Sequence, residues 1–163
     1  MFSTLSPHPH VASDNAAAML WVDVEARAES IPLLGIGVRR DGMVSMAVRS
    51  ARLDLGTPFV AVPKQVWEVV VLATRPAAEG SRLWVDCERR GVFPDLVFQD
   101  EGEEEIVVTP WQYVLELGEE RCLLLVGEME GGELREDAVL GWSAVRGRNV
   151  IIDAVEKRMG IRR

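Results

Sequence analysis

The sequence predicts a mostly β fold, a single barrel-like lobe with one main α-helix and one short helical turn. Short apolar runs recur with turn-forming residues roughly every eight to twelve positions, a spacing typical of β barrels and sandwiches. Only residues 63–74 show the apolar spacing of three and four residues that marks an amphipathic helix. We expect the lobe to span residues 19–163, since proline, serine and asparagine interrupt any apolar pattern over residues 1–18. Residues 1–18 are therefore expected to be an irregular tail.

The strands are expected to begin where the apolar content rises. Over residues 20–24 apolar side chains recur at every second position, which predicts a half-buried strand. Asp41 and Gly42 stand between two extended runs, and this dipeptide is typical of a hairpin because both central turn positions take a positive φ. We therefore expect one strand over residues 36–38 and, after the turn, a continuous strand over residues 44–53.

Residues 63–74 predict the main helix. Pro63 fits the first turn, where its missing N–H would have no partner inside the helix anyway. Pro76 is expected to end the helix. The face that packs on the core is expected to carry Val66, Val69, Val70 and Ala73.

The second half of the chain predicts a series of short strands and one helical turn. Thr109 is a suitable N-cap and Pro110 suits the first helical position, so residues 109–113 predict a single capped turn. The strands are expected at residues 83–87, 96–98, 106–108, 114–117, 122–126, 138–140, 150–152 and 159–161.

The charge of the chain restricts its partners. A formal net charge of −8 argues against nucleic acid or an anionic membrane surface as the main partner. Much of the acidity lies in residues 100–105, which we expect to form a solvated turn; docking of a basic partner is the alternative. Arg146 with Arg148 and Arg162 with Arg163 are candidate docking points, although exposed basic residues are usually plain surface.

Membrane insertion and cofactor binding find little support in the sequence. The longest apolar stretches, residues 69–73 and 122–126, are far too short to span a bilayer. Residues 1–18 lack the basic start and the long apolar block of a secretory signal. His8 and His10 lie in this tail and no CxxC motif is present, so we expect no metal site and no cofactor.

Residues 53–58 read Leu-Asp-Leu-Gly-Thr-Pro, and Phe-Val-Ala-Val-Pro follows them. This stretch resembles the active-site loop of the pepsin-like aspartic proteases, in which an apolar residue precedes Asp-Thr-Gly-Thr. Further segments resemble the C-terminal lobe of that family, in the same order along the chain. They are Trp67, residues 94–98, residues 109–113, Val139-Leu140-Gly141, residues 151–153 and residues 157–161. The resemblance implies one lobe of a pepsin-like acid-protease β-barrel over residues 19–163.

The resemblance places Asp54 at the position of a catalytic aspartate. The family uses two carboxylates, one from each lobe, that lie about 3 Å apart and share one proton. Gly56, Thr57 and Gly141 are implied as supports of the loop. Gly56 permits close approach of the backbone, the Thr57 hydroxyl can bond the Asp54 carboxylate, and Gly141 belongs to a segment that passes beside the loop.

Three positions depart from the family pattern. Leu55 replaces a threonine or serine whose hydroxyl helps to join the loops of the two lobes. Pro58 replaces a serine or threonine and removes a backbone N–H. Trp142 stands where the family has an aspartate. Since a second aspartate would have to come from another chain, we expect Asp54 to be inactive in a single chain.

Cys87 and Cys122 are the only cysteines in the sequence. The resemblance implies a disulfide between them, because this lobe of the family often carries one at similar positions. Such a bridge would close a loop of about 35 residues and contribute about 3–4 kcal/mol in the chain-entropy model. It would also indicate an oxidising compartment, luminal or organellar. Two buried free thiols in a reducing compartment are the alternative, so the localisation stays open.

A lone lobe allows three functions. The first is a noncatalytic aspartic-protease-like lobe that acts as a structural or interaction subunit of a larger protein assembly. The second is one half of a homodimeric or two-chain aspartic endopeptidase, and the third is a peptide-binding module without turnover. A free lobe exposes its inter-lobe face, and a large exposed apolar patch usually marks a protein partner. We therefore expect a protein partner on that face, with residues 1–18 as a second candidate surface.

Overall fold

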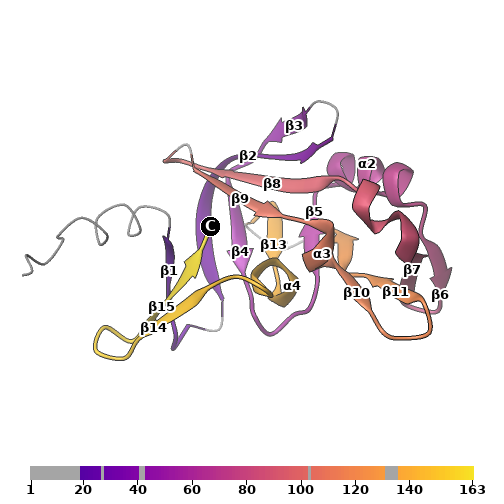
Figure 1. Ribbon diagram of the computed structural model, residues 1–163. Helices are drawn as coiled ribbons and strands as arrows, with labels where there is room; N and C mark the ends of the chain where they lie inside the picture. Colours follow the sequence, from indigo (N-terminus) through magenta and orange to yellow (C-terminus); the bar gives the residue numbers. More distant parts are fainter. Residues whose placement is uncertain (1–18, 27, 41–42, 103, 131–135) are drawn as a thin grey trace, which may run out of the picture.

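The computed structural model describes residues 19–26, 28–40, 43–102, 104–130 and 136–163. Half of these residues lie in β-strands and far fewer in helices, as the sequence predicts (Figure 1). The strands form three sheets, and side chains from all three contribute to one buried apolar cluster. The expected irregular tail over residues 1–18 and the expected turn at Asp41-Gly42 lie outside the described residues.

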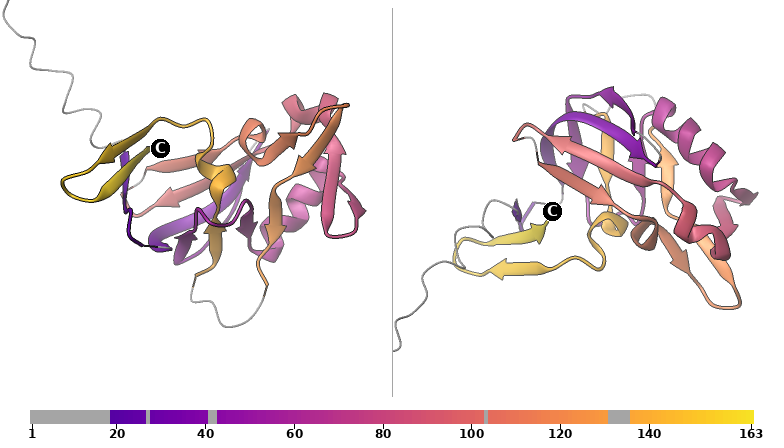
Figure 2. Two further views of the ribbon diagram at one scale, coloured as in Figure 1. Left: turned by 90° about the horizontal axis from the view of Figure 1, so that it is seen from below. Right: turned by 45° about the horizontal axis from the view of Figure 1, so that its top comes forward.

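The largest sheet has eight strands and curls into half a barrel (Figure 2). Two of its pairs, β4 with β13 and β5 with β12, are parallel, and the other pairs are antiparallel. Along the sheet the strands are β12 (Val126–Glu128), β5 (Val60–Val62), β13 (Ala138–Leu140), β4 (Ser50–Leu53), β2 (Glu29–Arg39), β8 (Asp95–Asp100) and β9 (Glu105–Val108), and β3 (Met43–Ala47) pairs with β2.

Strand β2 is much longer than the strand expected over residues 36–38. Its sequence contains a proline and two glycines, which weaken the strand signal although the strand is well paired on both sides. The strand expected over residues 44–53 forms as β3 and β4, with residues 48 and 49 between them. Both pair with β2 in one continuous register, from Glu29 opposite Leu53 to Arg39 opposite Met43. The Leu33 N–H donates to the Arg49 carbonyl (3.0 Å) between the two strands, so the prediction is confirmed apart from this short interruption.

The second sheet has four strands in the order β10-β11-β7-β6. A single strand expected over residues 122–126 is wrong, because Leu125 passes from this sheet to the largest one. Its N–H donates to the Tyr113 carbonyl (2.7 Å), and its own carbonyl accepts from the Val60 N–H (2.9 Å). The strands are β10 (Val114–Glu116), β11 (Arg121–Leu124), β7 (Arg82–Asp86) and β6 (Ala77–Glu79), and β6 was not predicted.

The main helix α2 (Lys64–Thr74) confirms the prediction for residues 63–74, with Pro63 directly before it. It packs on β2, β3 and β12. Val66 and Val70 are buried as expected, but the third buried residue is Thr74 rather than Ala73. The Thr74 hydroxyl donates to the Val70 carbonyl (2.8 Å), so this buried side chain has a hydrogen-bond acceptor.

Three shorter helical segments complete the described part. Helix α3 (Pro110–Tyr113) is the predicted capped turn, and the Thr109 N–H donates to the Gln112 side-chain oxygen at 2.9 Å. The 3-10 helix η1 (Cys87–Val92) and the helix α4 (Trp142–Val145) were not predicted. They are one or two turns long, too short to show an apolar period in the sequence.

The third sheet joins the two ends of the described chain, in the order β1-β15-β14. Its strands are β1 (Met19–Asp23), β15 (Arg158–Arg162) and β14 (Val150–Asp153). The hairpin of β14 and β15 extends beyond the curled sheet (Figures 1 and 2). The Asp153 carboxylate holds its turn by accepting the N–H groups of Val155 (3.2 Å) and Glu156 (3.1 Å). Strand β14 lies at the edge of this sheet and pairs on one side only within the described residues.

Candidate functional site

The loop that carries Asp54 connects β4 to β5. These two strands are not neighbours, because β13 lies between them, parallel to β4 and antiparallel to β5. The Asp54 N–H donates to the Leu140 carbonyl of β13 (2.9 Å), which fixes the start of the loop. The carboxylate then accepts the Gly56 N–H (3.0 Å), and the Asp54 carbonyl accepts the Thr57 N–H (3.3 Å). The loop is therefore closed by its own backbone around the aspartate.

Gly141 lies against this loop in the way the sequence predicts for a segment passing beside it. A Cβ atom at this position would lie 2.1 Å from the Phe59 carbonyl oxygen and 2.5 Å from the Thr57 carbonyl oxygen. The N–H groups of the next two residues donate into the loop, from Trp142 to the Thr57 carbonyl (2.7 Å) and from Ser143 to the Pro58 carbonyl (3.2 Å). Only a glycine allows this approach of two backbones.

The Asp54 carboxylate faces a positive charge that was not predicted. Arg52 precedes it by two residues, so both side chains lie on the same face of the strand. The Arg52 Nη2 atom lies 4.0 Å from Asp54 Oδ2, and the Asp54 side chain is 28% exposed. The alternation of β4 was the only signal in the sequence that could have indicated this pair.

Within the described residues, the recorded polar contacts of the Asp54 carboxylate are the Gly56 N–H and the Arg52 guanidinium. No second carboxylate lies among them. The Thr57 hydroxyl, which the sequence predicts as a further donor, makes no hydrogen bond to Asp54 in this part of the chain. Thr57 contributes through its backbone instead, with the N–H toward Asp54 and the carbonyl toward Trp142.

Large apolar side chains are exposed on the segments that build the loop. Leu55 is 37% exposed, Phe59 is 40% exposed and Trp142 is 42% exposed. We call these three side chains the loop rim. Trp142 also stacks with the Arg146 guanidinium, which lies 5.5 Å from its ring centroid. The segments that build the Asp54 loop thus present large apolar side chains to solvent.

A second apolar surface lies on the β14–β15 hairpin, and we call it the β14 edge. Ile152 is 72% exposed and Val155 in the turn is 88% exposed, and Val150 and Ile151 are also exposed. Three consecutive apolar residues on a strand edge that has no partner in the described part of the chain are unusual, because such edges template the addition of another strand. This surface is the best candidate for the partner face that the sequence predicts.

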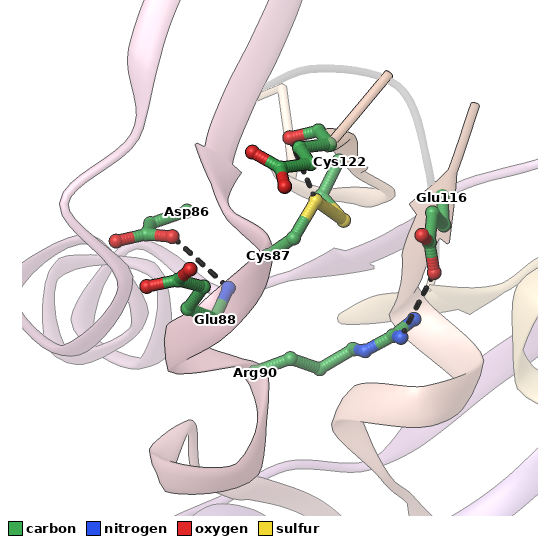
Figure 3. Close-up of a disulfide and its surroundings, with 7 residues drawn as sticks. Asp86, Cys87, Glu88, Arg90, Glu116 and Cys122 are labelled. Atoms are coloured by element: carbon green, nitrogen blue, oxygen red, sulfur yellow. Dashed lines mark hydrogen bonds and ion pairs between the residues drawn. A yellow bond between two sulfur atoms is a disulfide. The ribbon is translucent and has the colours of Figure 1, made fainter. Parts of the chain in front are cut away.

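Cys87 and Cys122 are joined by a disulfide with a Cα–Cα distance of 5.3 Å (Figure 3). The bridge ties η1 to β11, which lies in the middle of the four-stranded sheet. The Asp86 carboxylate caps η1 by accepting the Glu88 N–H (3.0 Å), and Arg90 at the other end pairs with Glu116 (3.2 Å). The bridge stands away from Asp54 and supports the lobe rather than the loop.

Tyr113 is fully buried in the core, and its hydroxyl donates to the Pro94 carbonyl (2.7 Å). Burial raises the pKa of Tyr113, and the negative charge of Asp95 raises it further. The phenol therefore stays neutral and acts as a structural donor. The interaction joins two of the segments that carry the family resemblance, residues 94–98 and 109–113.

The remaining expectations concern charges, metals and membranes. In the acidic run, Asp100 is buried and pairs with Arg163 (3.0 Å), whereas Glu101, Gly102 and Glu104 are exposed.

Among the described residues no three His, Cys, Asp or Glu side chains gather into a group able to hold a metal ion. His8 and His10 lie outside these residues. No helix in the described ranges has the length and apolar character needed to cross a membrane.

Comparison with known proteins adds no assignment. No model of a known protein family matches the chain, and no curated protein shows significant similarity to it.

Proposed function

We propose that this chain is an aspartic-protease-like lobe of the pepsin type that has no proteolytic activity and acts as a structural or interaction subunit of a protein assembly. The observation that carries the proposal is the environment of Asp54. The loop is closed by Gly56 and lies against Gly141, which agrees with the residues that carry the resemblance. Yet no second carboxylate contacts Asp54 among the described residues, and its charged neighbour is Arg52.

The chemistry of this family needs two different carboxyl states. One carboxylate is ionised and activates a water molecule, while the other is protonated and donates to the scissile carbonyl. Two like charges about 3 Å apart create this difference, because both cannot ionise together. A lone Asp54 beside a guanidinium has no such neighbour and supplies one of the two roles. Under this proposal the loop has a structural role rather than a catalytic one.

The interaction role rests on the two exposed apolar surfaces. In the loop rim, Leu55 is apolar where the family has a side chain with a hydroxyl group. The β14 edge offers backbone groups beside Ile151 and Ile152 that have no strand partner among the described residues. A standard protein interface buries about 800 Å² on each side. We propose that a protein partner covers the β14 edge, extends the three-stranded sheet by one or more strands and reaches the loop rim.

Proteolysis is the first test. Purified protein incubated with a denatured protein substrate is expected to release no peptides across acidic pH, and a pepstatin-type inhibitor is expected not to raise its melting temperature. The Asp54→Asn variant should match the wild type in both assays and in sedimentation. Acid-optimal cleavage that Asp54→Asn abolishes would overturn the proposal.

That result would establish the second candidate function, one half of a homodimeric or two-chain aspartic endopeptidase. One observation favours this candidate: the Asp54 side chain is 28% exposed, so a carboxylate on another chain can approach it. In that case two such carboxylates would share a proton, and the activity would follow a bell-shaped pH profile.

Assembly is the second test. A tagged copy produced in the cells that normally express the chain is expected to purify in a stoichiometric complex of defined mass. Ile152→Glu places a charge on the β14 edge and is expected to release the chain from that complex while it remains folded. Leu72→Glu is the matched control, because Leu72 is 77% exposed on α2 and lies outside the β14 edge. Equal loss of the complex in both variants would contradict the assigned surface.

A further inference from the structure

A groove of about 860 Å³ lies beside α3 and the segment that follows α4. None of the Asp54 loop residues lines it. Its lining includes Glu104, Glu105, Trp111, Arg146 and Arg148. The arginines were candidate docking points in the sequence, and the fold brings them to one wall although they belong to a chain of net charge −8.

Arg148 fixes the wall of the groove. Its guanidinium donates to the backbone carbonyls of Ala144 (2.7 Å), Arg162 (3.2 Å) and Val107, which belong to α4, β15 and β9. It has no carboxylate partner among the described residues, and burial lowers its pKa. The neighbouring backbone is held as well, because the Gln112 side chain donates to the Arg146 carbonyl (3.2 Å). These hydrogen bonds therefore hold the wall that carries Arg146 and Arg148 in place.

Arg146 adds a second guanidinium that lacks an acid. Burial lowers its pKa, and the positive charge of Arg90 lowers it further, so the two cations are close enough to repel. Its Nη1 atom is buried and has no hydrogen-bond partner among the described residues, and the same is true of Arg90 Nε. Arg90 itself lies over the Trp111 ring, 4.1 Å from the centroid, and pairs with the half-exposed Glu116.

Arg146 and Arg148 thus line the groove without a carboxylate partner among the described residues. The repulsion between the guanidinium groups of Arg146 and Arg90 is unfavourable unless an anion lies nearby. The fork of a guanidinium matches the two oxygens of a carboxylate or of a phosphate. Glu105, which also lines the groove, is already paired with Arg39 (2.6 Å).

We propose that the groove binds an oxyanion, a carboxylate or a phosphate group, at Arg146, with an adjoining planar apolar group packed on the exposed side of Trp111. Arg146 supplies the positive charge, Arg148 holds the wall, and Trp111 supplies an aromatic surface that is 61% exposed. Glu104 and Glu105 line the same groove and disfavour a second anionic group, so the ligand carries a single anionic group.

The test is a titration of the full chain with two probes, inorganic phosphate and benzoate, followed by the NMR signals of the Trp111 indole N–H and the Gly147 amide. Both signals are expected to shift saturably. Arg146→Gln is expected to weaken both probes about tenfold to hundredfold, the usual effect of losing a charged hydrogen bond. Arg82→Gln, an exposed arginine outside the groove, is the matched control and should leave both affinities unchanged.

Trp111→Ala separates the two parts of the ligand. It is expected to weaken benzoate, which has a ring to stack, and to leave phosphate nearly unchanged. Saturation by one probe alone assigns the oxyanion to that class. The proposal is overturned if neither probe shifts the wild-type signals saturably, a result that needs no variant. It is also overturned if Arg146→Gln, shown to be folded by its spectrum, binds both probes as tightly as the wild type.

Discussion

Replacing Gly141 by alanine tests how the passage of β13 beside the Asp54 loop stabilises the lobe. The added Cβ would lie 2.1 Å from the Phe59 carbonyl oxygen and 2.5 Å from that of Thr57. Both are backbone atoms, so no side-chain rotation can relieve the collision. The φ of Gly141 is −85° and its ψ is −170°, an extended conformation that any residue adopts. The effect of the substitution therefore comes from the contact and not from backbone strain.

The size of the effect follows from the hydrogen bonds around the contact. Separating the two backbones by about an ångström relieves the overlap, and the close-packed interior absorbs little of that movement. It weakens the bonds from Trp142 to Thr57 (2.7 Å) and from Ser143 to Pro58 (3.2 Å). Each such bond contributes about 0.5–1.5 kcal/mol net, and overpacking costs about 1–3 kcal/mol. We expect the free energy of unfolding to fall by about 3 kcal/mol or more.

Denaturation by guanidinium chloride, followed by tryptophan fluorescence with the disulfide intact, measures this change. The midpoint should fall while the dependence on denaturant stays constant, and the melting temperature should fall by about 6–12 °C for a chain of this size. Gly127→Ala in β12 is the matched control, because no atom lies within 4 Å of the added Cβ. The reasoning is refuted if Gly141→Ala unfolds at the same denaturant concentration as Gly127→Ala.

Two further predictions concern the interior. Tyr113→Phe is expected to lower the free energy of unfolding by about 1–2 kcal/mol at neutral pH, because the Pro94 carbonyl loses its donor. Burial raises the pKa of Tyr113 above its ordinary value near 10, so its contribution is complete below about pH 10 and is lost as the pH rises further. Tyr113 is the only tyrosine, so tyrosinate absorbance should appear only with unfolding, and its appearance in folded protein would contradict the assignment. Replacing Cys87 and Cys122 together by serine should lower the free energy of unfolding by about 3–4 kcal/mol, and unchanged denaturation would contradict that estimate.

The elements that the sequence predicts well are those with a local cause. Helix α2 follows from its apolar spacing between Pro63 and Pro76, and α3 follows from the Thr109 cap and Pro110. Strands β13, β14 and β15 lie within one residue or so of the expected positions, because short apolar runs between turns are a strand signal at any place in a chain.

The wrong strand predictions have their cause in neighbouring segments of the fold. Leu125 ends β11 because its backbone bonds both Tyr113 and Val60. This cause is not visible in the residues around Leu125. The long β2 was underestimated for the same reason, since its pairing on both sides outweighs the weak strand preference of proline and glycine.

The sequence by itself determined the β class and the main helix, because these depend on periods and turn residues that neighbours in the chain define. Only the tertiary structure decided what stands beside each functional group. It placed Arg52 against Asp54, left Ile151 and Ile152 on an open edge, and gathered Arg146 and Arg148 around one groove. Charge and exposure are properties of the space around a side chain, and segments far apart in the sequence fill that space.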